Sequence, residues 1–178
     1  MNIQASVKAV WLFALSIFVG MGIAWSSALA QDWDQVLPVA QRFVVLTAFN
    51  SAAVKDNETG LVWELAPSTG AVTFDSARYG CANKNVGGRK GWRIPSIPEL
   101  ASLIDSSVTS GVRLPTGHPF FTVEATTYWS ATIDPNHPTF VWGVRFNNGG
   151  VTTFDISSTV LANINAWCVR GGMNADRY

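Results

Sequence analysis

The pattern of apolar positions first separates the N-terminal segment from the rest of the chain. A largely apolar stretch runs from Ala9 to Trp25, directly after the charge of Lys8, and the small residues of Ala28-Leu29-Ala30 follow it. A positive charge, an apolar stretch and a small-x-small site are the parts of a secretory signal peptide. We therefore expect residues 1–30 to be cleaved and the remainder, from Gln31, to be exported to the periplasm or the cell exterior, with no membrane span. If it stayed uncleaved, the segment would serve as an N-terminal anchor.

The first strands are predicted directly after a short lead-in. Residues 31–52 are assigned to this lead-in and to a first strand in the β-rich run Arg42–Phe49. Two further runs, Ala53–Asp56 and Leu61–Leu65, flank the sequence Asn57-Glu58-Thr59-Gly60. Asparagine and glycine in such a connection favour a turn, so the pattern predicts a hairpin.

The pattern then changes to a helical period. Thr73 can cap a helix in which Phe74, Ala77 and Cys81 recur at i, i+3 and i+7, so that the three share one face. The polar, glycine-rich residues 83–91 predict a loop after this helix.

A second helix has the clearest start signal in the chain. Ser96 and Glu99 have the S-x-x-E spacing of a capping box, in which each side chain bonds to the backbone N–H of the other residue. Pro98 falls in the first turn, where a missing N–H costs nothing. The apolar spacing that follows predicts a helix that ends near Asp105.

The second half of the chain has the patterns of strands and turns. Residues 109–121 predict an irregular loop, and Asp134–Pro138 predict a turn. Strands are predicted at Thr126–Thr132, at Thr139–Phe146 and Val151–Ile156 as a hairpin around Asn147-Asn148-Gly149-Gly150, and at Ala166–Arg170. Two early helices followed by antiparallel strands indicate an α+β fold.

Composition limits the classes of protein to which the chain can belong. Its 178 residues carry 12 Lys plus Arg and 12 Asp plus Glu, for a formal net charge of zero, which argues against a nucleic-acid partner. Hydrophobic content of 48% excludes a disordered chain, and eight Trp favour a compact domain with aromatic anchors. Core positions are predicted for Trp63, Trp92, Trp129, Trp142 and Trp167.

The two cysteines, Cys81 and Cys168, form an even pair in a chain that is predicted to be exported. A disulfide is the default expectation in an oxidising compartment. A reactive or metal-binding role is the alternative, but the chain has no C-x-x-C, and neither histidine lies near a cysteine in the sequence.

Several stretches together resemble the Lcl C-terminal domain family, which comprises bacterial exported domains similar in fold to C-type lectins. The matching stretches are Thr59–Trp63, Thr73–Cys81, Gly91–Ser96 with Glu99-Leu100, Tyr128–Thr132, Trp142 with Val144 and Phe146, and Trp167–Gly172. The resemblance implies a domain over residues 53–172, with residues 173–178 as a tail. It also implies two helices packed on a small antiparallel sheet, a disulfide from the first helix to the last strand, and a binding or adhesion role.

The resemblance to C-type lectins suggests one candidate contact surface. Lectins that bind sugar through calcium use a carboxylate- or amide-Pro-Asn motif, which Asp134-Pro135-Asn136 resembles. Relatives place ligands on the loop-and-hairpin side, here Asp134, Asn136, Arg145 and Asn147. Calcium is a minority hypothesis, because only two side-chain ligands can be named and a turn explains the motif better. No cofactor and no metal are therefore predicted.

A second candidate surface is basic. Lys84, Arg89 and Lys90, with Arg93 nearby, form the densest group of cations in the chain. Such a loop can bind a sulfated or acidic polysaccharide through charge-assisted hydrogen bonds, or can simply be a solvated loop. Arg93 belongs to the motif before the second helix and is expected to be structural.

These observations favour an exported, non-catalytic binding or adhesion module for a glycan or another surface macromolecule. The chain has no G-x-S-x-G, no H-E-x-x-H and no P-loop. A diverged enzyme of the formylglycine-generating type, whose family has a similar W-R-hydrophobic-P stretch and a reactive cysteine pair, is one alternative. A structural component of an envelope assembly is the other.

Overall fold

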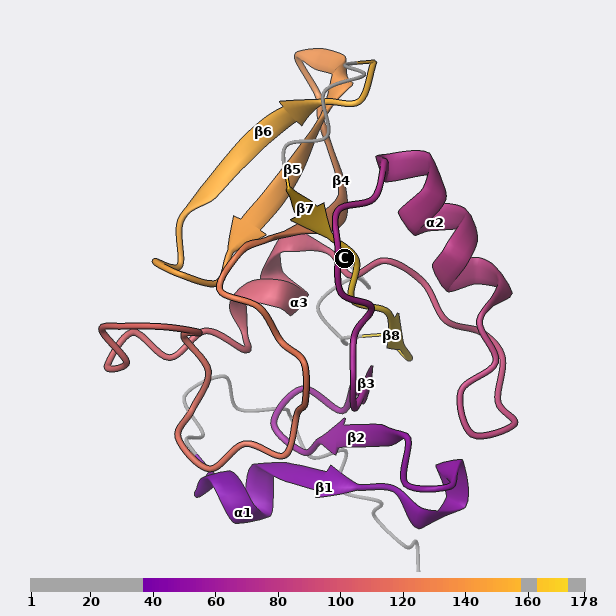
Figure 1. Ribbon diagram of the computed structural model, residues 1–178, viewed down its shortest axis with the longest axis vertical. Coiled ribbons are helices and arrows are strands. Elements are labelled where there is room, and N and C mark those ends of the chain that lie inside the picture. The colour runs from indigo at the N-terminus through magenta and orange to yellow at the C-terminus, as the bar shows by residue number, and fades with distance from the viewer. Residues whose placement is uncertain (1–36, 158–162, 173–178) are drawn as a thin grey trace, which may run out of the picture. The chain divides into compact units, whose positions relative to one another are not determined.

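The computed structural model describes residues 37–157 and 163–172, all within the second of two units of the chain, Gln31–Tyr178 (Figure 1). The predicted signal peptide and the predicted tail, residues 173–178, lie outside the described residues, as do residues 31–36. Among the described residues the fold is α+β, with short helices and two four-stranded sheets.

The first sheet has the order β1-β2-β3-β8, with antiparallel neighbours throughout. Its strands are β1 (Phe43–Val45), β2 (Ala53–Asp56), β3 (Val62–Glu64) and β8 (Val169–Arg170). The β2–β3 pairing confirms the predicted hairpin. The predicted strand Arg42–Phe49 is wrong at both ends, because the one-turn helix α1 (Val39–Arg42) precedes β1 and the 3-10 helix η1 (Thr47–Phe49) follows it.

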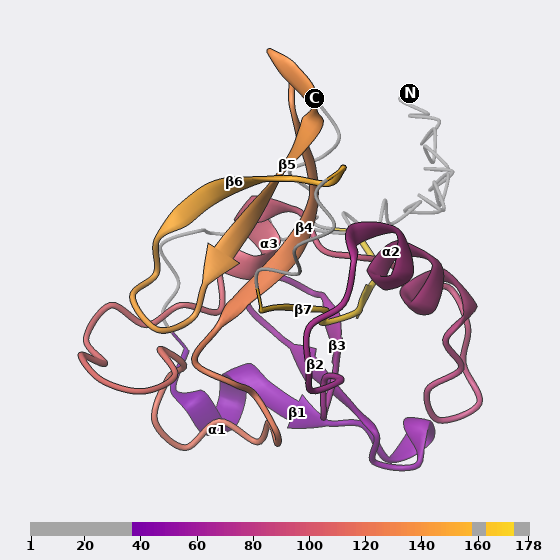
Figure 2. The ribbon, with the colours of Figure 1, turned by 45° about the horizontal axis from the view of Figure 1, so that its top comes forward.

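The second sheet has the order β6-β5-β4-β7. Its strands are β4 (Thr127–Asp134), β5 (His137–Arg145), β6 (Val151–Asp155) and β7 (Ile164–Asn165). Neighbours are antiparallel except β4 and β7, which pair in parallel, and β4, β5 and β6 run side by side (Figure 2). The expectation of one small antiparallel sheet is therefore corrected to two sheets.

The last segment of the domain connects the two sheets. Ala166–Arg170 is not one strand, because β7 pairs with β4 and β8 pairs with β3, and residues 166–168 lie between them. The cause is Glu64 on β3, whose carboxylate accepts a hydrogen bond from the Cys168 N–H at 3.0 Å and whose backbone carbonyl accepts one from the Trp167 indole at 3.0 Å. These bonds replace part of a strand ladder.

Both predicted helices form. Helix α2 (Phe74–Asn83) begins at Thr73, whose hydroxyl accepts a hydrogen bond from the Ser76 N–H, and it buries Phe74, Ala77 and Cys81 as expected. Helix α3 (Ile97–Ala101) begins at Ser96, whose N–H donates to the Glu99 carboxylate at 2.8 Å.

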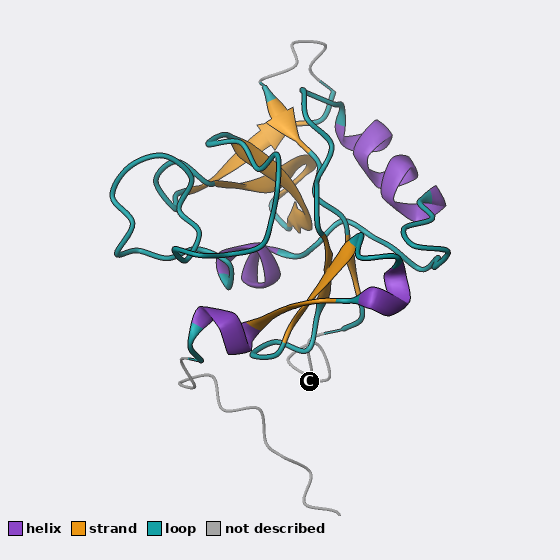
Figure 3. Ribbon diagram, turned by 60° about the horizontal axis from the view of Figure 1, so that its bottom comes forward, coloured by secondary structure: helices purple, strands orange, loops and turns teal. Residues whose placement is uncertain are grey.

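Helix α3 ends four residues earlier than predicted. The chain after Ala101 continues in i to i+3 turns, and the Ser102 carbonyl accepts a hydrogen bond from the Arg42 guanidinium at 2.5 Å. This distant partner occupies a carbonyl that a further helical turn would use. The segment from there to β4 is irregular, as the loop composition predicted (Figure 3).

Two clusters of buried side chains form the core. Trp167 lies at the centre of the first and packs against four rings, with centroid distances of 4.9 Å to Phe120, 5.4 Å to Trp63, and 5.7 Å to both Tyr128 and Phe146. Trp92, Trp129 and the disulfide lie in the second. Trp142 is only half-buried, unlike the other four tryptophans that were predicted to be core residues.

The disulfide joins Cys81 on α2 to Cys168 beside β8, with Cα atoms 5.4 Å apart. Cys168 points away from Trp167 and Val169, since it belongs to the second cluster and they belong to the first. The Cys81–Cys168 pairing confirms the expectation from the sequence, but the bridge ends at the residue before β8 and not within a strand.

Candidate functional site

The four residues predicted on the loop-and-hairpin side do not lie together. Asp134 and Asn136 are in the turn between β4 and β5, whereas Arg145 ends β5 and Asn147 follows it in the next turn. Strand β5 has nine residues, and at 3.3–3.4 Å per residue its ends are about 27 Å apart. One small ligand cannot contact both pairs.

The Asp134 carboxylate closes its own turn. It accepts a hydrogen bond from the Asn136 N–H at 2.9 Å and pairs with the His137 ring at 3.2 Å. The pKa of Asp134 lies below its usual value, mainly because of the hydrogen bond from the Asn136 N–H and secondly because of the contact with the His137 ring. In the described part of the chain, no three His, Cys, Asp or Glu side chains are grouped so that they could hold a metal ion.

Two cations of the basic stretch have structural partners. Lys84 pairs at 2.5 Å with the buried carboxylate of Glu64, so it is turned inward from the predicted patch. Arg93 binds both carboxylate oxygens of Glu99, at 2.7 and 2.5 Å, and donates to the Gly171 carbonyl at 2.7 Å. Its structural role was expected from its position in the motif.

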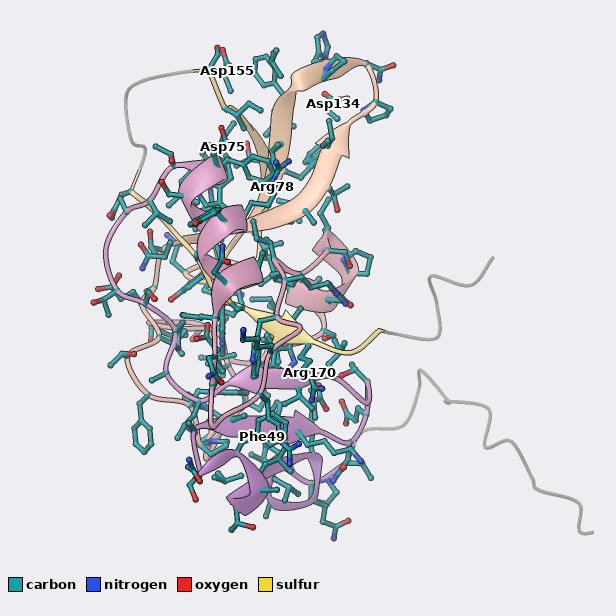
Figure 4. All side chains as sticks on the ribbon, turned by 90° about the vertical axis from the view of Figure 1, so that its right-hand side faces the viewer. Phe49, Asp75, Arg78, Asp134, Asp155 and Arg170 are labelled. Carbon is teal, nitrogen blue, oxygen red and sulfur yellow. A yellow bond between two sulfur atoms is a disulfide. The ribbon has the colours of Figure 1, made fainter. Side chains whose placement is uncertain are left out.

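Arg89 and Lys90 are exposed, and the fold brings a third cation, Arg170 on β8, close to Arg89. The Arg89 and Arg170 Cζ atoms lie 5.8 and 5.7 Å from the centroid of the Phe49 ring. Figure 4 labels Arg170 and Phe49, which lie in the same part of the domain. The side chain of Arg170 also runs along the loop, because a Cβ built on Gly91 would lie 3.6 Å from its Nε. We name Arg89, Lys90 and Arg170 the cationic cluster. No carboxylate within the described ranges pairs with any of the three.

The loop that carries Arg89 and Lys90 is fixed against the Phe49 backbone. Gly87 has φ +57°, and a Cβ there would lie only 2.0 Å from the Phe49 carbonyl oxygen, so glycine is required at this contact. The loop is closed by reciprocal backbone hydrogen bonds between Val86 and Arg89, at 3.0 and 3.1 Å. The Trp92 indole donates to the Arg89 carbonyl at 2.8 Å and packs edge-on against Phe49.

A cleft of about 300 Å³ is one competing location. It is lined by Leu37, Val39, Arg42, Glu58, Ile104, Asp105, Ser106 and Pro115. Its only cation, Arg42, is already paired with Asp56 at 3.0 Å and with Glu58 at 2.9 Å. Arg42 therefore serves to join α1 to the β2–β3 turn, and the cleft offers a ligand no free positive charge.

The two histidines are in separate places. His137 pairs with Asp134, whereas His118 lies in the irregular loop with its ring 5.8 Å from that of Phe120. Burial lowers the pKa of His118, and its Nδ1 has no hydrogen-bond partner in the part of the chain that the structure describes. The geometry does not bring the two rings to a common site.

The fold is that of a disulfide-linked α+β domain built on two small sheets. The model of the Lcl C-terminal domain family matches residues 52–170, and the chain belongs to this family. No curated protein matches the chain. Among residues 37–157 and 163–172, no helix has the length and apolar composition needed to cross a membrane.

Proposed function

We propose that the protein is an exported, non-catalytic binding module whose ligand is an acidic surface glycan, bound at the cationic cluster. The observation that supports this most strongly is the gathering of Arg89 and Arg170 on one aromatic ring without a carboxylate partner in the described residues. Sulfate and carboxylate groups form strong charge-assisted hydrogen bonds with guanidinium groups.

The charge balance of the chain implies that an acidic ligand would bind at a local patch of cations and not over the whole surface. Because the formal net charge is zero, the protein as a whole does not attract polyanions, and any such affinity must come from a local patch. The second cation of the loop, Lys90, is exposed, so its side chain can contact a further acidic group of a polymer. The residues around Asp134 offer a polymer no comparable group of cations.

Two further parts of the proposal concern fold and compartment. A disulfide from the first long helix to the last segment supports a C-type-lectin-like arrangement, in keeping with the resemblance in the sequence. A disulfide is also common in exported proteins and rare in reducing compartments. Adhesion through a surface glycan would suit such a location.

The enzyme alternative depends on cysteine chemistry. Both cysteines of the chain are in the disulfide, each 1% exposed, so the oxidised protein presents no thiol to a substrate. Thiol titration of the native chain from Gln31 should therefore find no reactive group. Two titratable thiols would instead support the formylglycine-generating type.

The proposed site predicts that R89A/R170A weakens binding to dextran sulfate about tenfold or more, because each guanidinium contributes a charge-assisted contact. Binding would be measured by calorimetry on the chain from Gln31, at low and high salt, with and without a chelator. Wild-type affinity should fall with salt and ignore the chelator.

The matched control is R78A/R145A, which removes two exposed arginines outside the cluster and should bind like wild type. A loss of binding in the control but not in R89A/R170A would move the site to Arg78 on α2 or Arg145 on β5. A loss on chelation alone would move it to Asp134 and Asn136. If neither sulfated, carboxylated nor neutral polysaccharides bind, the glycan proposal is wrong and a protein partner in an envelope assembly is favoured.

A further inference from the structure

We infer that Phe49 is the positioning residue of the cationic cluster and fixes the spacing of the acidic groups that the cluster accepts. This inference rests on the proposed function. Phe49 lies before the stretch that matches the family, residues 52–170, whereas Arg89 and Arg170 lie within it. The site is thus completed by a segment that the family match does not include.

The first argument is geometric. Arg89 comes from the loop after α2 and Arg170 from β8, and both Cζ atoms lie within 6 Å of one ring centroid. Their separation therefore cannot exceed twice that distance. A guanidinium within about 6 Å of an aromatic ring is attracted by the negative face of the ring.

The second argument concerns charge. Two neighbouring cations repel each other, and most proteins hold them with a carboxylate, as Glu99 holds Arg93 here. A carboxylate neutralises the charge that it positions. An aromatic ring attracts the cation without cancelling its charge, so Arg89 and Arg170 are drawn to one ring and still carry their full charge toward a ligand.

The third argument is that Phe49 is itself held in place by burial and by its backbone hydrogen bonds. Phe49 is 8% exposed, ends η1, and is followed by Asn50 and Ser51 at φ +51° and +55° in the turn to β2. Its N–H donates to the Leu46 carbonyl, and its carbonyl accepts from the Ala52 N–H, both at 3.0 Å. The contact with Gly87 then places the loop on this fixed point.

The segment that carries Phe49 is firmly part of the domain. Strand β1 pairs with β2, and Phe43 packs edge-on against Phe120 with centroids 5.1 Å apart. Arg42 forms its buried pair with Asp56. The segment from α1 to η1 is therefore paired and packed into the domain, as a specificity-determining segment requires.

The test uses F49L and F49M, which keep an apolar side chain but remove the aromatic face. Each variant should bind dextran sulfate about fivefold more weakly than wild type, since two cation–π contacts are lost. The salt dependence should stay unchanged because no charge is removed. F49Y, which keeps the ring, should bind within about twofold of wild type.

A second measurement does not depend on the folding of any variant. Dextran sulfate is titrated into the wild-type chain, and the Nε–Hε resonances of Arg89 and Arg170 are followed by NMR. Both should shift with one midpoint. Separate midpoints, or wild-type affinity in folded F49L and F49M, would overturn the inference. If R89A/R170A also binds normally, the proposed function fails as well, so the two failures are distinguishable.

Discussion

Replacing both cysteines, C81A/C168A, is expected to lower the free energy of unfolding of the mature chain by about 4 kcal/mol. The disulfide closes a loop with a sequence separation of 87 residues, and in the chain-entropy model such a loop restricts the unfolded state by about 4–5 kcal/mol. Both sulfurs are also buried in the second core cluster, so their removal leaves small cavities. Urea unfolding followed by tryptophan fluorescence would measure the loss.

The control for this variant is the wild-type chain unfolded in urea with a reductant, where the cross-link is absent but the sulfur atoms remain. Its stability should lie between those of oxidised wild type and C81A/C168A. A loss below about 1 kcal/mol in the double variant would contradict the prediction, because a native disulfide of this loop length contributes more. Binding should weaken too, since Cys168 is two residues from Arg170.

Local sequence signals predicted the elements that depend on neighbouring residues. The starts of α2 and α3 follow from Thr73 and from Ser96 with Glu99, which lie within three residues of their partners. The β2–β3 and β5–β6 hairpins follow from the composition of their turns. In these places the hydrogen bonds that define the structure are encoded nearby.

The errors have distant causes. Helix α3 ends early because Ser102 accepts a hydrogen bond from Arg42, 60 residues away. The predicted last strand is divided because the Cys168 N–H donates a hydrogen bond to the carboxylate of Glu64, which is 104 residues away in the sequence. A periodicity argument sees neither partner, since each is brought close only by the tertiary fold.

The candidate site shows the same limit. The sequence singled out Lys84, Arg89 and Lys90 by their closeness in the chain, but Lys84 faces Glu64. Arg170 and Phe49 were missed because they reach the loop only through β8 and η1. The one available signal was the cation in Trp167–Gly172, which had no evident partner in its own motif.

The second large effect is expected for E99Q, which should lower the free energy of unfolding by about 2–3 kcal/mol at neutral pH. The Glu99 side chain is 1% exposed, accepts two hydrogen bonds from Arg93 and accepts one from the Ser96 N–H. Glutamine keeps the shape but removes the charge, leaving the Arg93 guanidinium with a weaker partner. Chemical unfolding at several pH values would measure the difference.

The pH dependence gives this prediction its sharpest form. Burial alone raises the pKa of Glu99, but the hydrogen bonds from Arg93 and Ser96 and the charge of Arg93 outweigh burial and lower the pKa below its usual 4.5. The folded state therefore binds this proton less readily than the unfolded state, so the stabilisation is complete above pH 4.5 and is lost as the pH falls through the lower folded value. The stability difference between wild type and E99Q should shrink over that range.

The control is D75N, which removes an exposed carboxylate from α2 and should differ much less from wild type in stability at neutral pH. A difference between wild type and E99Q that stayed constant down to the pH of acid unfolding would show that the Glu99 charge does not stabilise the fold.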